Sequence, residues 1–207
     1  MQQKQNMEQK RRTTLAMLTL SGIFSLPLSA CKPHSIAFNG IDITGADYGN
    51  DFHLTGHDGK AYTLSQFKGK FVLLFFGYKQ CQDICPTALT RALAIRQQLG
   101  ADRNKLQVLF ITLDPERDTQ PLLAEYMRAF DPEFLGLYGS VQQTIEVAKA
   151  FRIFFKKVSN GDSYSMDHTA ITYVYDSGNQ LRLALKHEQS AEQCAADLRA
   201  LIQSQSI

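Results

Sequence analysis

The sequence predicts an α/β fold in which a central mixed sheet is flanked by helices. Phe71 to Phe76 is a continuous apolar run, as is typical of a strand buried on both faces of a sheet, and the largely apolar run Leu106 to Leu113 is predicted to be a second buried strand. A segment of helical character follows each run, and crossover helices between strands imply parallel pairing. Near the end of the chain, Ser177 to Gln180 separates two further apolar segments and indicates a hairpin, which adds antiparallel strands.

The first half of the domain contains three predicted elements. Phe52 to Phe67 is predicted to be an N-terminal β-hairpin, because Asp58-Gly59 at its centre is a strong short-range turn signal. The buried strand Phe71 to Phe76 comes next. A helix from Thr87 to Leu99 follows it, and Gly100 can end that helix.

The second half is predicted to alternate helices and strands. The ranges are a helix after Thr119 that runs through Phe130, a strand from Phe134 to Tyr138, a helix from Val141 to Phe151, hairpin strands Ala170 to Asp176 and Leu181 to Lys186, and a helix from Ala191 to Ile202. Thr119, Ser140 and Ser190 are the candidate N-caps. This order of elements is typical of a thioredoxin-like sandwich. The segment between Phe151 and His168 fits either a projecting loop or a hairpin that closes the fold.

The start of the chain resembles a bacterial lipoprotein signal. A basic stretch ending in Arg11-Arg12 precedes an interrupted apolar stretch, Leu15 to Leu28, that is too short for a comfortable membrane span. The sequence Leu28-Ser29-Ala30-Cys31 resembles a lipobox, which implies cleavage before Cys31 and lipidation of its sulfur. An uncleaved anchor helix with a chance cysteine is the alternative.

Three segments follow from this reading. Residues 1–30 are the predicted signal peptide, residues 31–51 a tether rich in Gly, Asp and Asn, and residues 52–207 the folded domain. The domain is then lipid-anchored on the periplasmic side of a bacterial membrane, where disulfides can persist. Removal of residues 1–30 takes away four basic residues and one acid, so the net charge changes from +2 to about −1. No basic field remains that would indicate nucleic acid as a partner.

Cys81 and Cys85 lie at the junction between the first buried strand and its helix. Pro86 fits the first helical turn, so Cys85 is expected at or next to the N-cap, where the helix dipole lowers thiol pKa values. In sheets of this kind, sites form beyond the carboxyl ends of the parallel strands. Asp114 to Thr119 follows the second such strand. His168 precedes the strand Ala170 to Asp176 and reaches the same edge if that strand is antiparallel.

Two thiolates and one imidazole form a soft site of low coordination number. Such ligands suit Cu(I), and imidazole also tolerates Cu(II). A structural zinc ion would require a fourth protein ligand, and none stands at an obvious spacing. The alternative for His168 is an ordinary polar residue near a strand end, and the cysteine pair alone also fits thiol-disulfide exchange.

Five stretches of the sequence resemble the Sco/SenC family of copper-binding, cytochrome c oxidase assembly proteins. They are CQDICP, LDPERDT, AFDPEFLGLYGS, AKAFRIFFKKV and DHTAITYVYD, and the resemblance covers roughly Phe52 to Ile202. It implies that Cys81, Cys85 and His168 are the metal ligands. Gln82 departs from the family pattern, which commonly has proline after the first cysteine, and this bears on affinity and redox potential rather than on the ligands.

The expected function is that of a membrane-tethered copper metallochaperone rather than an enzyme. Its recipient, by resemblance, is the copper-site subunit of cytochrome c oxidase, and a disulfide between Cys81 and Cys85 would switch copper binding off. The alternatives are a thiol-disulfide oxidoreductase that reduces the recipient's cysteines and a redox or copper sensor.

The remaining polar residues receive structural interpretations. Glu116, Arg117 and Asp118 are interpreted as turn and capping residues, with an ion network at the rim of the site as the alternative. Asp83 is either a solvated loop acid or a modulator of the thiols. Cys194 is expected to be a buried apolar residue, and His53, His57 and His187 are expected at the surface.

Overall fold

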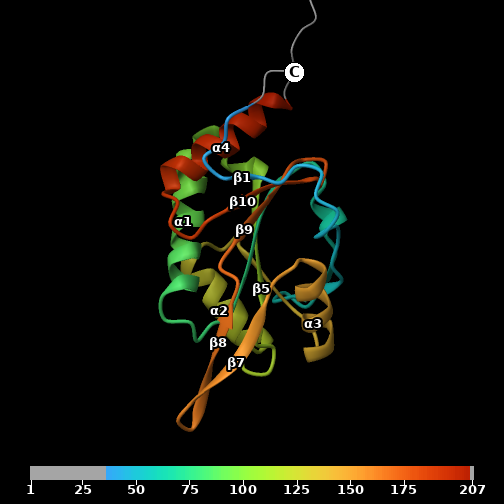
Figure 1. The fold of residues 1–207 in the computed structure, drawn as a ribbon, viewed down its shortest axis with the longest axis vertical. Coiled ribbons are helices and arrows are strands. Elements are labelled where there is room, and N and C mark those ends of the chain that lie inside the picture. Colours follow the sequence, from blue (N-terminus) through green and yellow to red (C-terminus); the bar gives the residue numbers. More distant parts are fainter. Residues whose placement is uncertain (1–35, 206–207) are drawn as a thin grey trace, which may run out of the picture. The chain divides into compact units, whose positions relative to one another are not determined.

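The computed structural model describes residues 36–205, and in this part of the chain helices cover both faces of an eight-stranded mixed sheet (Figure 1). Its strands are β1 (Ile41–Asp42), β2 (Leu54–Gly56), β3 (Ala61–Tyr62), β4 (Phe71–Gly77), β5 (Leu106–Thr112), β6 (Leu135–Tyr138), β9 (Thr172–Tyr175) and β10 (Leu181–Leu185). Their order across the sheet is β1-β10-β9-β4-β5-β6-β2-β3. The predicted signal peptide of residues 1–30 and the lipidation site Cys31 lie outside the described residues.

The centre of the sheet confirms the predicted pairing. β4 pairs in parallel with β5 from Phe71 opposite Leu106 to Gly77 opposite Thr112, and β5 pairs in parallel with β6. β9 pairs antiparallel with both β4 and β10. Every residue of β4 is buried, which explains why its sequence is apolar without alternation. The predicted N-terminal hairpin is present as β2 and β3, although its strands are shorter than expected.

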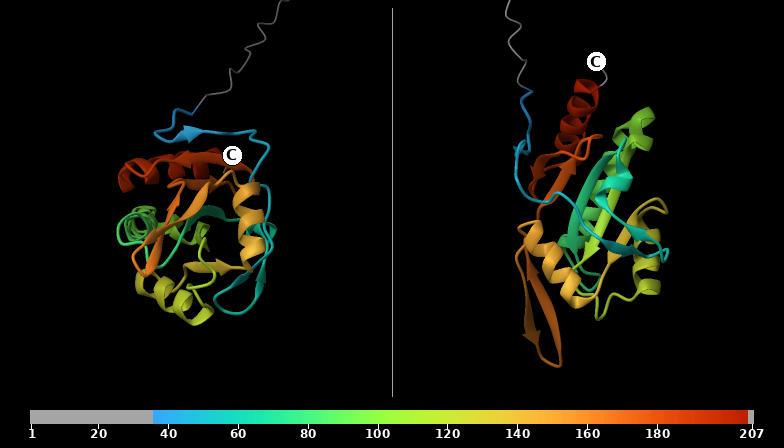
Figure 2. Two further views of the ribbon diagram at one scale, coloured as in Figure 1. Left: turned by 60° about the horizontal axis from the view of Figure 1, so that its bottom comes forward. Right: turned by 90° about the vertical axis from the view of Figure 1, so that its right-hand side faces the viewer.

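Four α-helices surround this sheet. They are α1 (Ile84–Gln98), α2 (Gln120–Phe130), α3 (Val141–Ala150) and α4 (Ala191–Ser204). α1 packs against α4 and α2, and α3 lies on the opposite side of the sheet (Figures 1 and 2). Ser140 and Ser190 cap α3 and α4 as predicted, each in a capping box that also uses a glutamine three residues later. Within residues 36–205, no helix combines the length and hydrophobicity that crossing a bilayer requires.

Helix α1 begins earlier than the sequence indicated. Its first residue is Ile84, so Cys85 is the second residue of the helix rather than at or next to the N-cap position, which Asp83 occupies. Pro86 lies in the first turn as expected. Backbone N–H groups there have no intrahelical acceptor, so the lack of an N–H in proline costs no hydrogen bond. Thr119 precedes α2 as predicted, but its side chain makes no capping hydrogen bond.

The predicted tether differs from the structure over residues 36–51. β1 in this segment pairs with β10, and the backbone amides of Asn39 and Gly40 each donate to the carboxylate of Asp197 at 2.8 Å. The hydroxyl of Tyr175 donates to the Gly49 carbonyl at 2.8 Å. Residues 36–51 are therefore bonded into the folded domain instead of forming a separate tether. A two-residue strand held by a carboxylate far along the chain leaves no periodic pattern in the sequence.

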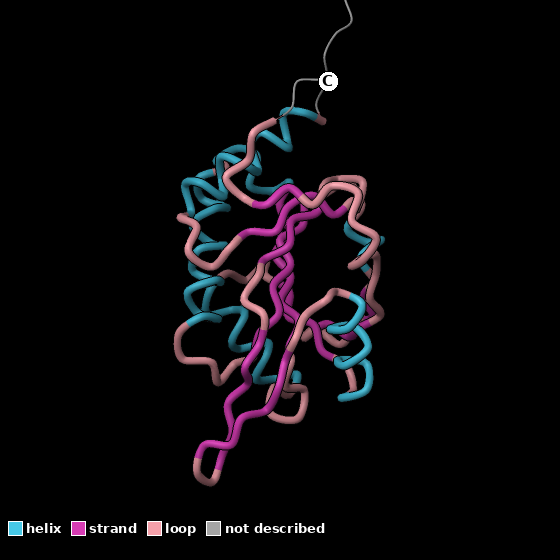
Figure 3. The backbone as a smooth tube through the Cα atoms, in the orientation of Figure 1, coloured by secondary structure: helices cyan, strands magenta, loops and turns pink. Residues whose placement is uncertain are grey.

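The segment before His168 combines features of the two alternatives that the sequence left open, because it is a hairpin and it projects. β7 (Phe155–Asn160) and β8 (Ser163–His168) pair antiparallel and form a sheet of their own. The hairpin extends beyond the central sheet at the bottom of Figure 1, and Figure 3 shows it as two long neighbouring strands. Gly161 has a φ of 59° at the first position of the two-residue turn, a conformation that glycine adopts readily.

Candidate metal centre

Three separate segments bring Cys81, Cys85 and His168 together. Cys81 lies in the loop after β4, Cys85 in the first turn of α1, and His168 is the last residue of β8. Their potential ligand atoms all lie within 4.8 Å of one another. The convergence expected at the carboxyl edge of the parallel strands is therefore present, and the hairpin β7–β8 delivers the histidine to it.

Gly77 allows the Cys85 thiol to reach this position. Cys85 is fully buried beneath the end of β4, and a Cβ atom on Gly77 would lie only 2.7 Å from its sulfur. The same Cβ would lie 2.9 Å from the rings of Phe75 and Phe110. Only a residue without a side chain fits here. The sequence analysis missed this role, and the only signal was a glycine at the end of a wholly apolar strand.

The orientation of the His168 imidazole is fixed from its far side. Its Nδ1 lies 3.1 Å from the Thr169 carbonyl, and because a carbonyl only accepts, Nδ1 carries the proton and donates. Nε2 is the nitrogen that faces the thiols, and it lies 3.8 Å from the Cys85 sulfur. The rings of Phe75 and Tyr78 meet the imidazole edge-on, with centroids 6.2 and 6.0 Å away. A neutral imidazole with its proton on Nδ1 directs the Nε2 lone pair towards the thiols, as a metal ligand requires.

The two thiols have unequal acidities. A hydrogen bond from the Cys85 thiol is the main reason that the pKa of Cys81 is lowered to about 3, and His168 and the amides of Cys85 and Asp83 act in the same direction. Hydrogen bonding to Cys81, together with burial, raises the pKa of the Cys85 thiol. Cys81 is also partly exposed, whereas Cys85 is buried. In the reduced protein, Cys81 is therefore an accessible thiolate and Cys85 a buried, protonated thiol that donates a hydrogen bond to it.

Asp118 holds the loop that leads to Cys81. Its Oδ2 accepts hydrogen bonds from the Lys79 amide at 3.0 Å and from the Thr112 hydroxyl at 2.6 Å. The side chain is buried, and burial raises the pKa of this carboxyl against the effect of the two hydrogen bonds. Because Lys79 lies two residues before Cys81, Asp118 constrains the first thiol. The alternative of an ion network among Glu116, Arg117 and Asp118 is met only in part, since Arg117 pairs with Asp114 and Glu116 with Lys157, while Asp118 accepts hydrogen bonds instead.

Other candidate residues take structural positions. Cys194 is fully buried on α4, as predicted, and Asp83 is exposed. His53 is exposed as predicted, whereas His57 and His187, which were also expected at the surface, are both partly buried. The Nδ1 of His57 accepts a hydrogen bond from the Gly136 amide at 3.0 Å. Sequence spacing could not reveal this contact between β2 and β6.

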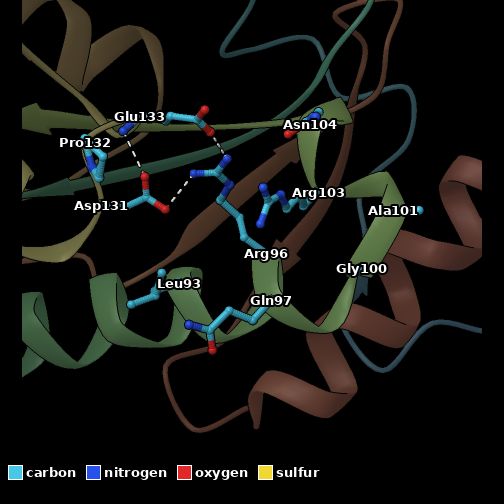
Figure 4. Close-up of a pocket in the computed structure, with 10 residues that line it drawn as sticks. All are labelled: Leu93, Arg96, Gln97, Gly100, Ala101, Arg103, Asn104, Asp131, Pro132 and Glu133. Carbon is cyan, nitrogen blue, oxygen red and sulfur yellow. Dashed lines mark hydrogen bonds and ion pairs between the residues drawn. The ribbon is translucent and has the colours of Figure 1, made fainter.

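A pocket at the opposite end of α1 is unrelated to the thiols (Figure 4). Arg96 lies in it, about 16 Å along the helix from Cys85 at 1.5 Å per residue. Its buried guanidinium pairs with Asp131 at 2.7 Å and with Glu133, so these charges satisfy one another. The pocket joins α1 to the loop before β6 and has a structural role.

The three converging groups match a thiophilic ion in their chemistry. Two sulfurs and one imidazole nitrogen are soft or intermediate donors, which favour Cu(I) over hard cations. In residues 36–205 the group of possible ligands comprises these three side chains alone, one fewer than a structural zinc site requires.

The chain is similar to proteins of one family in both sequence and structure. The SCO1/SenC family model matches residues 42–203. A SCO2-like protein of Rickettsia felis is 37% identical over 178 residues, which cover 84% of this chain and 85% of the relative. The solved structure of Bradyrhizobium japonicum ScoI with copper bound is 38% identical with a TM-score of 0.69, covering 74% of this chain and 99% of that one. Yeast Sco1 with copper bound is 31% identical with a TM-score of 0.70, covering 77% and 90%.

Proposed function

The chain belongs to the SCO1/SenC family, and from this premise we propose that it is a copper metallochaperone whose cargo binds to Cys81, Cys85 and His168. The observation that carries the proposal is the convergence of two sulfurs and the imidazole of His168 within 4.8 Å. Two related structures, 38% and 31% identical to this chain, contain copper.

Each ligand has a distinct part in loading. Cys81 is the accessible thiolate and is the first donor that an incoming copper ion meets. Cys85 carries a proton in the reduced protein, so loading releases one proton from its sulfur, and unloading returns it. His168 supplies Nε2 to the ion while its Nδ1 donates to the Thr169 carbonyl. Three donors leave room for a ligand from the recipient, which permits transfer by ligand exchange on the side where Cys81 is exposed.

The recipient in this proposal is the copper-site subunit of cytochrome c oxidase, because Sco proteins form a family of cytochrome c oxidase assembly proteins. Lipidation at Cys31 would hold the domain on the periplasmic side of the membrane. Analysis of membrane-extracted protein by mass spectrometry tests the anchor. A diacylglyceryl group on Cys31 is the expected result, and a mature chain that retains Met1 contradicts it.

Copper titration of the reduced protein tests the ligand set. The parent should bind one Cu(I) in competition with a chelator, and His168→Ala should bind markedly more weakly because two thiolates leave the ion undersaturated. Cu(II) should be affected most, since it prefers nitrogen donors more than Cu(I) does. His187→Ala is the matched control, because His187 is also partly buried but is not one of the converging groups. Equal affinity of the parent and His168→Ala for both copper states would contradict the site.

A thiol-disulfide oxidoreductase is the second candidate, and the unequal acidity of the two thiols favours it. The Cys81 thiolate would attack a substrate disulfide and release one substrate thiol. Cys85 would then attack the mixed disulfide, which releases the second thiol and leaves Cys81 and Cys85 oxidised to a disulfide. His168→Ala separates the two functions, because exchange needs only the cysteines.

A further inference from the structure

The hairpin that carries His168 is attached to the domain without strand pairing. β7 and β8 pair only with each other, so no backbone ladder joins them to the central sheet. At the base of the hairpin, the Thr169 amide donates to the Phe154 carbonyl at 2.9 Å, and this bond also joins the two arms to each other. Side-chain contacts must therefore fix how the hairpin lies against the thiol-bearing loop.

Alternation along β8 shows which side chains make these contacts. Tyr164, Met166 and His168 are two residues apart and so lie on the same face of the strand. Met166 is buried, and Tyr164 and His168 are partly buried, while Ser163 and Asp167 are exposed. The face that presents the imidazole to the thiols is thus the face that Tyr164 presents to the loop after β5.

Arg117 contacts Tyr164 through a hydrogen bond and through stacking on its ring. Its Nη1 donates to the Tyr164 carbonyl at 2.9 Å, and its guanidinium carbon lies 3.6 Å from the centre of the Tyr164 ring. Arg117 Nε donates to Asp114, and the Tyr164 hydroxyl donates to the other oxygen of the same carboxylate at 2.8 Å. The guanidinium, the phenol and the carboxylate therefore each contact the other two. These contacts fix both the position and the rotation of β8 at Tyr164.

The loop end of this set is firmly anchored to the frame that carries the cysteines. The Asp114 side chain has no exposed surface, and its backbone amide donates to the Thr112 hydroxyl at 3.0 Å. The amide of Leu113 donates to the Gly77 carbonyl at 2.7 Å, which extends the pairing of β4 and β5 to the edge of the site. The loop after β5 thus contacts both parts of the site, because Asp118 holds the approach to Cys81.

We propose that Arg117 is a positioning residue for His168, which holds the β8 face through Tyr164 so that the imidazole meets the two thiols. The inference rests on the proposed copper site. Without Arg117 the hairpin remains paired, tied at its base and bonded from the Tyr164 hydroxyl to Asp114, but it loses the bond to the Tyr164 carbonyl and the guanidinium stacked on the ring, so β8 is held less firmly against the cysteines. The imidazole then has to be ordered each time copper binds. This weakens the contribution of the His168 nitrogen to copper affinity and leaves the contribution of the two sulfurs intact.

Arg117→Gln is the decisive variant, and Arg117→Lys is its conservative companion. Lysine keeps the charge but lacks the planar fork and the stacking surface, so it should restore little of the function. Loss of a group that orients a metal ligand typically weakens metal binding roughly 10–100-fold, and Arg117→Gln should reach this range for Cu(II). Glu116→Gln is the matched control, because Glu116 is the preceding loop residue and its pair with Lys157 on the same hairpin is exposed.

Three measurements on the full chain decide the proposal. In the copper-free protein, amide hydrogen exchange in β8 should accelerate in Arg117→Gln and stay at the parent rate in Glu116→Gln. In the Cu(II) protein, electron paramagnetic resonance should show nitrogen coupling in the parent and the control and its loss in Arg117→Gln. Alkylation of Cys81 should proceed at the parent rate in all variants, which shows that the domain and its thiols are intact.

Parent-like exchange in β8 together with parent-like nitrogen coupling in Arg117→Gln would overturn the proposal. If Arg117→Gln does not fold, Arg117→Lys provides the same readouts, and its full retention of nitrogen coupling with unchanged β8 exchange would be equally decisive against it. A parent protein that itself lacks nitrogen coupling would contradict the copper site instead. In that case the exchange rates of the copper-free variants still decide whether Arg117 positions the strand.

Discussion

Gly77→Ala places one methyl group between β4 and the buried thiol of the site. The new Cβ would lie 2.7 Å from the Cys85 sulfur, whereas ordinary van der Waals contact begins at 3.4 Å. The sulfur must therefore move away by about 0.7 Å, because the rings of Phe75 and Phe110 leave the methyl group no other direction. Metal–ligand distances tolerate a deviation of only about ±0.2 Å, so this shift disturbs the site. Copper affinity should fall roughly 10–100-fold, and overpacking should lower the free energy of unfolding by about 1–3 kcal/mol.

Gly136→Ala separates the two effects. A Cβ on Gly136 in β6 would lie 2.6 Å from Leu123 and 2.9 Å from Met127, so it overpacks the core to a similar degree away from the ligands. It should lose about the same 1–3 kcal/mol in chemical denaturation and keep the copper affinity of the parent. The reasoning is refuted if Gly77→Ala keeps the parent's copper affinity while both variants show the stability loss.

Three further predictions concern acidity, an ion pair and the domain boundary. Because the pKa of Cys81 is lowered to about 3, its alkylation rate should be nearly constant from about pH 5 to pH 8 while Cys194 stays unreactive in the native protein; a tenfold rise per pH unit would show an ordinary thiol. Arg96→Gln leaves the partly buried Asp131 without its partner and should lower the free energy of unfolding by about 2 kcal/mol without changing copper affinity, so a variant as stable as the parent would be contrary evidence. A chain that begins at Phe52 should be less stable than one that begins at Ile36 by about 3 kcal/mol or more, through the loss of buried hydrogen bonds, and equal stability would restore the tether.

The parts of the fold that could be predicted are those whose pattern is local. β4 is an uninterrupted apolar run, β5 is apolar except for Gln107 and Thr112, and the capping serines of α3 and α4 precede their helices directly. Cys81 and Cys85 stand at a strand-to-helix junction, so their proximity follows from chain connectivity. His168 could be placed because an antiparallel strand returns to the edge where parallel strands end.

The parts that could not be predicted depend on contacts between distant residues. β1 is only two residues long, and the segment before it is held by Asp197, 157 or more positions away in the sequence. Arg117 and Tyr164 are 47 residues apart, and neither alone indicates a contact. The need for glycine at position 77 depends on a clearance of a fraction of an ångström, which no sequence pattern encodes.

X-ray absorption at the copper edge of the reduced, Cu(I)-loaded protein tests the central claim most directly, because it counts the donor atoms around the ion. The account predicts two sulfurs and one nitrogen in the parent, and two sulfurs without that nitrogen in His168→Ala. A parent spectrum with sulfur donors only, or one that is unchanged in His168→Ala, would contradict a site built from Cys81, Cys85 and His168.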